Sequence, residues 1–194
     1  MYDLVQGVHA RMRATGLLFD MAQGMRPAPA LPPPADEALL VRAEAFLGFP
    51  LPPELRALYL GVADGGFGPG YGMNPLGELV CQHRDALAGE GPTAGFTWRR
   101  GVLPLLTWGC GILSCCDALA PDAPVWTFDP HMHRLDGTSR AIWEDASGAV
   151  VSEFEQLDQP DRAAVAYVLA CSSLRRWLED WCTGVSLWER RFGE

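Results

Sequence analysis

The chain has 194 residues and a mass of 21.1 kDa, a size that suits one domain with a short extension. Its 24 acidic residues outnumber its 15 basic residues, for a formal net charge of −9, and every basic residue is an arginine because the sequence contains no lysine. This composition excludes a Schiff-base lysine and a lysine phosphate loop, and it disfavours nucleic acids and anionic membranes as partners, since both bind basic surfaces.

The N-terminal part of the chain is predicted to form a helical arm followed by a linker. Apolar residues at loose helical spacing predict a helical arm over residues 1–26. Five prolines follow within eight residues, a density that neither a helix nor a central strand tolerates. We therefore expect a stiff, extended linker over residues 27–35 and a main domain over residues 36–194.

The main domain is predicted to open with two helices within residues 36–62. Asp36 is placed to cap the first helix, whose apolar residues recur at helical spacing until Gly48. A short proline-rich connector leads into the second helix, where Pro53 suits the first turn.

A glycine-rich stretch from Asp64 to Gly72 follows the second helix. Its glycines Gly66, Gly68, Gly70 and Gly72 alternate with other residues, a spacing that matches neither the dinucleotide-binding fingerprint nor a phosphate loop. We interpret the stretch as left-handed turns packed closely against another part of the chain. A cradle for a small ligand is the alternative.

The centre of the chain has the pattern of β-strands. Short apolar runs between turn residues lie at 102–108, 112–116, 124–128 and 141–144. Their close spacing favours antiparallel hairpins, because parallel crossovers need more residues. Alanines favour a helix over residues 163–170, with a strand as the alternative, and helical periodicity predicts a closing helix over residues 173–182. The expected fold is α+β, with helices packed on a mainly antiparallel sheet.

The cysteines and the N-terminus bear on the cellular compartment. Of six cysteines, Cys115 and Cys116 are adjacent and the others are scattered, which is unlike a disulfide framework. No apolar run approaches the roughly 18–20 residues of a membrane helix, and the first 25 residues lack the pattern of a signal peptide. We expect a cytoplasmic protein with reduced thiols.

Three consecutive segments of the main domain resemble a known family. They are Leu47–Arg56, Leu58–Tyr59 and Asp64–Gly72, in the order helix, LGxxLP, helix, (N/D)GG. This order is similar to that of the SUKH superfamily, which contains the fungal Smi/Knr cell-wall regulators and many bacterial immunity proteins. The stretch Trp108–Gly111 and the closing helix also match, so that the resemblance spans residues 36–188. Asp64 stands where the family often has asparagine, and either residue makes the same turn or cap.

The resemblance implies an α+β domain that acts by binding rather than by catalysis. Bacterial members look like immunity proteins that bind and block a polymorphic toxin, often a nuclease or a deaminase. The fungal members imply the alternative of a cytosolic adaptor that binds a cellular partner. On this basis we expect an immunity protein. The missing lysine, the glycine spacing and the incomplete ligand sets predict no catalytic residue, no bound metal and no cofactor.

Cysteine and histidine residues offer two half-sites for a metal ion. Cys81 with His83, and His131 with His133, would each share one face if they lay on a strand. A full site would need both halves to meet, and no Cys-x-x-Cys pair supports it. Buried thiols and surface histidines are therefore favoured over a metal site.

A cysteine hydrolase is the more distant alternative. It would pair Cys115 or Cys116 with His131 or His133, oriented by Asp117 or Asp129. The residue types are present, but adjacent cysteines in an apolar strand favour a core position for one of them, so no catalytic site is predicted.

The tryptophans are predicted to divide between the core and a binding surface. The four that fall in strand or helix patterns, and so in the predicted core, are Trp108, Trp126, Trp177 and Trp181. Trp98 and Trp143 lie beside charges in loops, where each is either an interface anchor or a lid over the core.

Six acidic residues without a compensating cation lie between Arg140 and Arg162. They form either a solvated face or a docking surface for a basic protein partner, such as a toxin that acts on nucleic acid. We predict that acidic side chains around an aromatic anchor occlude the toxin. The predicted contact residues are Trp143, Glu144, Asp145, Glu153, Glu155 and Asp158.

Overall fold

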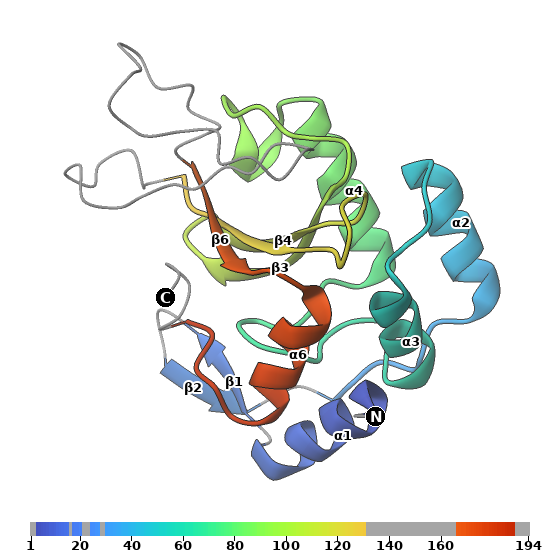
Figure 1. Ribbon diagram of the computed structural model, residues 1–194, viewed down its shortest axis with the longest axis vertical. Helices are drawn as coiled ribbons and strands as arrows, with labels where there is room; N and C mark the ends of the chain where they lie inside the picture. The colour runs from blue at the N-terminus through green and yellow to red at the C-terminus, as the bar shows by residue number, and fades with distance from the viewer. Residues whose placement is uncertain (1–2, 16, 21–23, 28–29, 131–165, 189–194) are drawn as a thin grey trace.

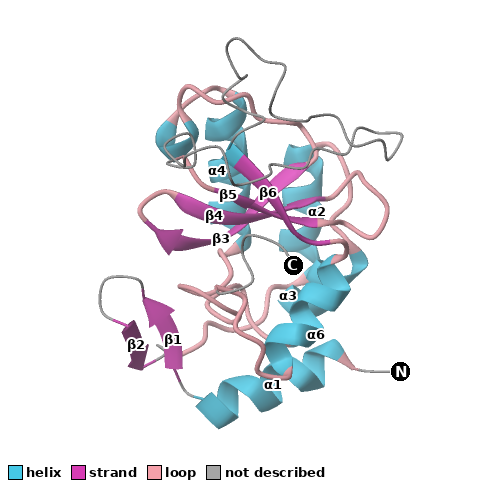
Figure 2. Cartoon of the chain, turned by 60° about the vertical axis from the view of Figure 1, so that its left-hand side comes forward, coloured by secondary structure: helices cyan, strands magenta, loops and turns pink. Residues whose placement is uncertain are grey.

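The computed structural model describes residues 3–15, 17–20, 24–27, 30–130 and 166–188. These residues have the expected α+β fold, in which helices pack around a four-stranded antiparallel sheet (Figures 1 and 2). The elements are α1 (Leu4–Thr15), β1 (Leu17–Asp20), β2 (Gly24–Pro27), α2 (Glu37–Leu47), α3 (Pro53–Gly61), α4 (Leu76–Leu87), η1 (Gly91–Thr93), β3 (Val102–Gly109), β4 (Ile112–Asp117), β5 (Val125–Phe128), β6 (Tyr167–Cys171) and α6 (Leu174–Cys182).

Three helices lie where the sequence predicted them. The Asp36 carboxylate accepts a hydrogen bond from the backbone N–H of Leu39 at 2.7 Å, and α2 ends at Gly48, whose φ of +75° is left-handed. Helix α3 begins at Pro53, and Ser173 caps α6. The predictions of these helices are therefore confirmed.

The main sheet has the strand order β3-β4-β5-β6, and each strand is antiparallel to its neighbours. Strands β3, β4 and β5 match the expected apolar runs to within one residue at each end. The preference for a helix was wrong over residues 167–171, because β6 pairs with β5 there, with Trp126 opposite Leu169. Pairing with a neighbouring strand overrides the helical preference of the nearby alanines. The run at 141–144 lies outside the described residues.

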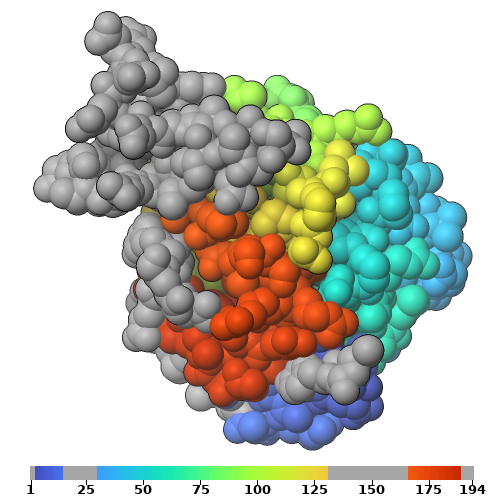
Figure 3. Space-filling model, in the orientation of Figure 1, coloured from blue at the N-terminus to red at the C-terminus, as the bar shows by residue number. Residues whose placement is uncertain are grey.

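The N-terminal arm is only partly helical. Helix α1 ends at Thr15, and β1 and β2 pair as an antiparallel hairpin, so the prediction of a helix was wrong for residues 17–20 and 24–26, and Pro27, where the linker was predicted to begin, ends β2. Gly16 follows the helix in the sequence, and glycine is a poor helix former. The space-filling view shows α1 along α6 (Figure 3), and α1 buries Leu4 and Val8 in the core of the main domain.

Both faces of the sheet are covered by apolar side chains. Cys116 belongs to the larger core cluster, which also contains side chains from α1, α2, α3, α4 and α6. Its neighbour Cys115 belongs to a smaller cluster around Trp98 and Phe128. The two adjacent cysteines point to opposite faces, as the two-residue period of a strand requires, and both are buried.

The glycine-rich stretch packs along the outer edge of β3. Tyr71 N–H donates to the Thr107 carbonyl at 3.1 Å, and Asn74 N–H donates to the Leu105 carbonyl at 2.7 Å. Gly70 has a φ of +57°, and a Cβ there would lie 2.8 Å from the Thr107 oxygen. The stretch therefore satisfies and covers the edge strand, and the prediction of a closely packed loop is confirmed.

Candidate functional site

Helix α4 has no counterpart in the sequence-based predictions, although it forms one wall of the candidate site. Its N-terminus is held by Asp64, whose carboxylate accepts a hydrogen bond from Leu76 N–H at 2.8 Å. Leu76, Leu79, His83 and Ala86 are buried on one side of it. Their helical spacing is the signal that could have located the helix.

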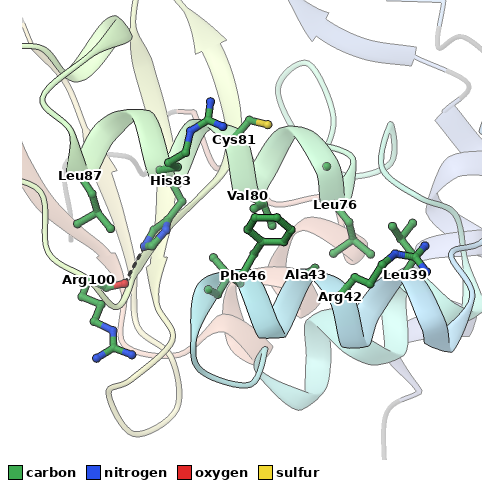
Figure 4. Close-up of a pocket in the computed structure, with 13 residues that line it drawn as sticks. Leu39, Arg42, Ala43, Phe46, Leu76, Val80, Cys81, His83, Leu87 and Arg100 are labelled. Atoms are coloured by element: carbon green, nitrogen blue, oxygen red, sulfur yellow. Dashed lines mark hydrogen bonds between the residues drawn. The ribbon is translucent and has the colours of Figure 1, made fainter.

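A groove of about 480 Å³ lies between α2 and α4 (Figure 4). The two helices pack against each other, and each contributes apolar side chains to the groove. The apolar side chains that line it include Leu39, Ala43 and Phe46 from α2, and Leu76, Val80 and Leu87 from α4.

Two large apolar side chains of the groove are exposed to solvent. Phe46 is 82% exposed, and Leu87, on the opposite helix, is 46% exposed. Figure 4 shows Phe46 extending from α2 toward Val80 of α4. The inner face of α2 is meanwhile buried through Leu40 and Leu47, so that this helix is apolar on more than one side. An amphipathic surface helix would place a polar residue at position 46.

His83 lines the groove from a buried position on α4. Its Nε2 lies 2.7 Å from the Arg100 carbonyl oxygen, and because a carbonyl only accepts, Nε2 is the nitrogen that donates. The ring meets Phe49 edge to face, with centroids 6.0 Å apart. Burial lowers the pKa of His83 below its ordinary value, so the imidazole is neutral at pH 7.

Arginines supply the charge around the groove. Arg42, Arg84 and Arg100 line it, and within the described part of the chain no Asp or Glu does. Arg84 pairs with Asp85 at 2.7 Å, whereas Arg100 donates to the Gly48 carbonyl at 3.1 Å. Arg42 forms no ion pair with any residue that the structure describes. The groove is thus locally cationic in a chain whose net charge is −9.

None of the contact residues predicted from the sequence is among the described side chains that line this groove. Trp143, with the acidic residues between 144 and 158, lies outside the described part of the chain. Trp98 is 7% exposed, which favours its interpretation as part of the core over an interface anchor. The four tryptophans predicted to be core residues are buried, which confirms that prediction.

The residues of the two chemical alternatives are only partly described. Burial raises the pKa of the Cys115 and Cys116 thiols, which disfavours the reactive thiolate. Cys81 and His83 lie on a helix, not on a strand, with Cys81 exposed and His83 buried. In the part of the chain that the structure describes, no group of three or more His, Cys, Asp or Glu side chains is arranged to hold a metal ion. His131 and His133 lie outside it.

We expect a maleimide probe at pH 7 to label Cys81 and Cys110 in the folded protein and to leave Cys115 and Cys116 unlabelled. The first pair is exposed, whereas the second is buried with raised thiol pKa values. Peptide mass spectrometry measures the labelling, and the protein unfolded in urea serves as the control in which all four react. Preferential labelling of Cys115 or Cys116 in the folded protein would contradict this expectation and favour the hydrolase alternative.

None of the described helices is both long enough and apolar enough to cross a membrane. Comparison of the chain with models of known protein families and with curated protein sequences finds no match. The resemblance to the SUKH superfamily therefore remains a prediction that depends on the motifs between Leu47 and Gly72.

Proposed function

We propose that the protein is a non-catalytic, cytoplasmic binding protein of the immunity type, which blocks a basic, nucleic-acid-acting toxin by stoichiometric binding. The resemblance of residues 47–72 to the SUKH superfamily supports the immunity role. The net charge of −9 supports a basic partner, because opposite charge speeds association.

The observation that carries the binding role is the exposure of Phe46 beside the groove. A single exposed apolar residue is ordinary on a protein surface, but Phe46 lines the same groove as Val80 and Leu87. Contiguous exposed apolar surface of this kind is typical of protein interaction sites. The buried thiols of Cys115 and Cys116 support binding over cysteine-dependent catalysis.

The test uses the toxin domain encoded beside this gene and measures its activity as the purified protein is added. We expect complete inhibition at one equivalent, together with association that slows as the salt concentration rises. The double variant Glu153→Arg with Glu155→Arg should slow association, and Trp143→Ala should mainly speed dissociation.

Unchanged toxin activity at a tenfold excess of the protein would overturn the immunity role. The absence of a toxin gene beside this one would favour the cytosolic adaptor instead. Inhibition with salt-insensitive association would leave the immunity role standing and contradict the acidic contact surface.

A further inference from the structure

The groove has the shape of a site for a protein segment. It lies between two helices of similar length, since α2 has 11 residues and α4 has 12. Grooves of this kind bind an amphipathic segment that inserts apolar side chains at spaced positions. Val80 and Leu87 offer apolar surface along α4, and Leu39 and Phe46 offer it along α2.

The exposure of Phe46 favours a protein segment over a small ligand. Small-molecule sites enclose roughly 70–90% of the ligand surface, and their walls are largely formed before binding. Phe46 remains 82% exposed, so a molecule confined to the cavity would leave much of this ring in water. A polypeptide segment lying across the groove can cover both Phe46 and Leu87, which is where burial of apolar area would contribute most to affinity.

The charges around the groove determine the chemistry of that segment. Figure 4 shows Arg42 near Leu39 at one end of the groove and Arg100 near Leu87 at the other. Among the residues that the structure describes, Arg42 has no ion-pair partner, and the Arg100 side chain donates to the Gly48 carbonyl and pairs with no carboxylate. Because no carboxylate of the described residues lines the groove, both guanidinium groups are available to an incoming acid. A basic segment would meet charge of the same sign and be rejected.

We propose that the groove between α2 and α4 binds a short amphipathic segment of a protein partner, with apolar side chains on Phe46, Val80 and Leu87 and with acidic side chains near Arg42 at one end or near Arg100 at the other. The inference rests on the proposed function in treating the chain as a binding protein, but it does not require the partner to be a toxin. It also assigns the groove a preference for acidic ligands, opposite to the preference expected from the net charge of −9.

The experiment selects random 12-residue peptides, displayed on phage, against the full-length chain. We expect the enriched peptides to combine Asp or Glu with large apolar residues. The most enriched peptide is then synthesised, and its affinity is measured by fluorescence anisotropy at two salt concentrations. A higher salt concentration should lower the affinity of the peptide, because salt screens the charges of the exposed arginines.

Groove variants locate the binding site. Phe46→Asp and Leu87→Asp should each lower the affinity for the peptide at least about 30-fold, as expected for residues at the centre of an interface. Arg42→Glu should weaken it about 5- to 10-fold through charge reversal. The matched control is Val41→Asp, because Val41 is 54% exposed on the same helix and does not line the groove. Circular dichroism verifies that each variant is folded. Phe46→Asp and Leu87→Asp change different helices, so one of them is enough to locate the binding site if the other does not fold.

The inference would be overturned by enrichment of basic peptides, by the absence of any enriched peptide, or by equal binding to wild type and Phe46→Asp. Sedimentation of the wild-type chain as a dimer that Phe46→Asp converts to a monomer would also overturn it, since a second copy would then be the occupant. Toxin inhibition is not part of this experiment. A chain that blocks its toxin but selects no acidic peptide would therefore refute this inference alone.

Discussion

We expect Trp98→Ala to lower the free energy of unfolding by about 3–5 kcal/mol, the range for deleting a large aromatic side chain from a core. The Trp98 ring packs against Phe128 and Tyr167, with both centroid distances 5.7 Å. Its Nε1 also donates to the Val102 carbonyl at 2.8 Å, so truncation leaves a buried acceptor with one partner fewer. Urea denaturation followed by circular dichroism measures the change.

Two controls separate the contribution of packing from that of the indole hydrogen bond and from the effect of removing an aromatic ring at an exposed position. Trp98→Phe retains an aromatic ring but loses the indole N–H, and should lie between wild type and Trp98→Ala. Phe46→Ala removes an aromatic ring that is 82% exposed, and should change the free energy of unfolding by no more than about 0.5 kcal/mol. If Trp98→Ala were as stable as wild type, Trp98 would be a surface residue available to a partner.

Gly72→Ala should lower the free energy of unfolding by about 2–5 kcal/mol. Gly72 has a φ of +89°, a left-handed conformation that costs a residue with a Cβ roughly 1–2 kcal/mol. The added Cβ would also lie 2.8 Å from the backbone carbon and oxygen of Gly66, and overpacking of this kind typically costs about 1–3 kcal/mol more. The same urea denaturation measures the loss.

Two other glycines provide matched controls for this substitution. Gly89 has a φ of +74° but open space around it, so Gly89→Ala isolates the conformational cost, about 1–2 kcal/mol. Gly77 lies in α4 with nothing within 4 Å of a Cβ, and Gly77→Ala should be neutral or stabilising by up to about 1 kcal/mol. A Gly72→Ala variant no less stable than Gly89→Ala would mean that the glycine-rich stretch has room for side chains and that the cradle alternative deserves a ligand search.

The helices predicted correctly are those whose signals lie within their own ends. Asp36 caps α2 through a residue three positions away, and Ser173 caps α6 in the same way. Helix α4 has a local signal in its apolar spacing, but its N-terminus depends on Asp64, which lies 12 positions before the N–H that it binds. Strand β6 depends on a still more distant partner, β5, so that local alanines pointed to the wrong structure. The elements predicted correctly and those that were missed differ in how far along the chain their stabilising partners lie, because a local sequence pattern carries no information on distant pairing.

The sequence by itself determined the α+β class, the cap of α2, the closing helix α6, the tight glycine-rich stretch and the excess of acidic residues. The groove was decided only by the tertiary structure, because neither α2 nor α4 forms it alone. The same holds for its charge: a net charge of −9 sums over the whole chain, whereas the field at one site depends on which side chains folding brings together. Folding places Arg42 from α2, Arg84 from α4 and Arg100 from the segment before β3 around one groove, which no carboxylate of the described residues lines.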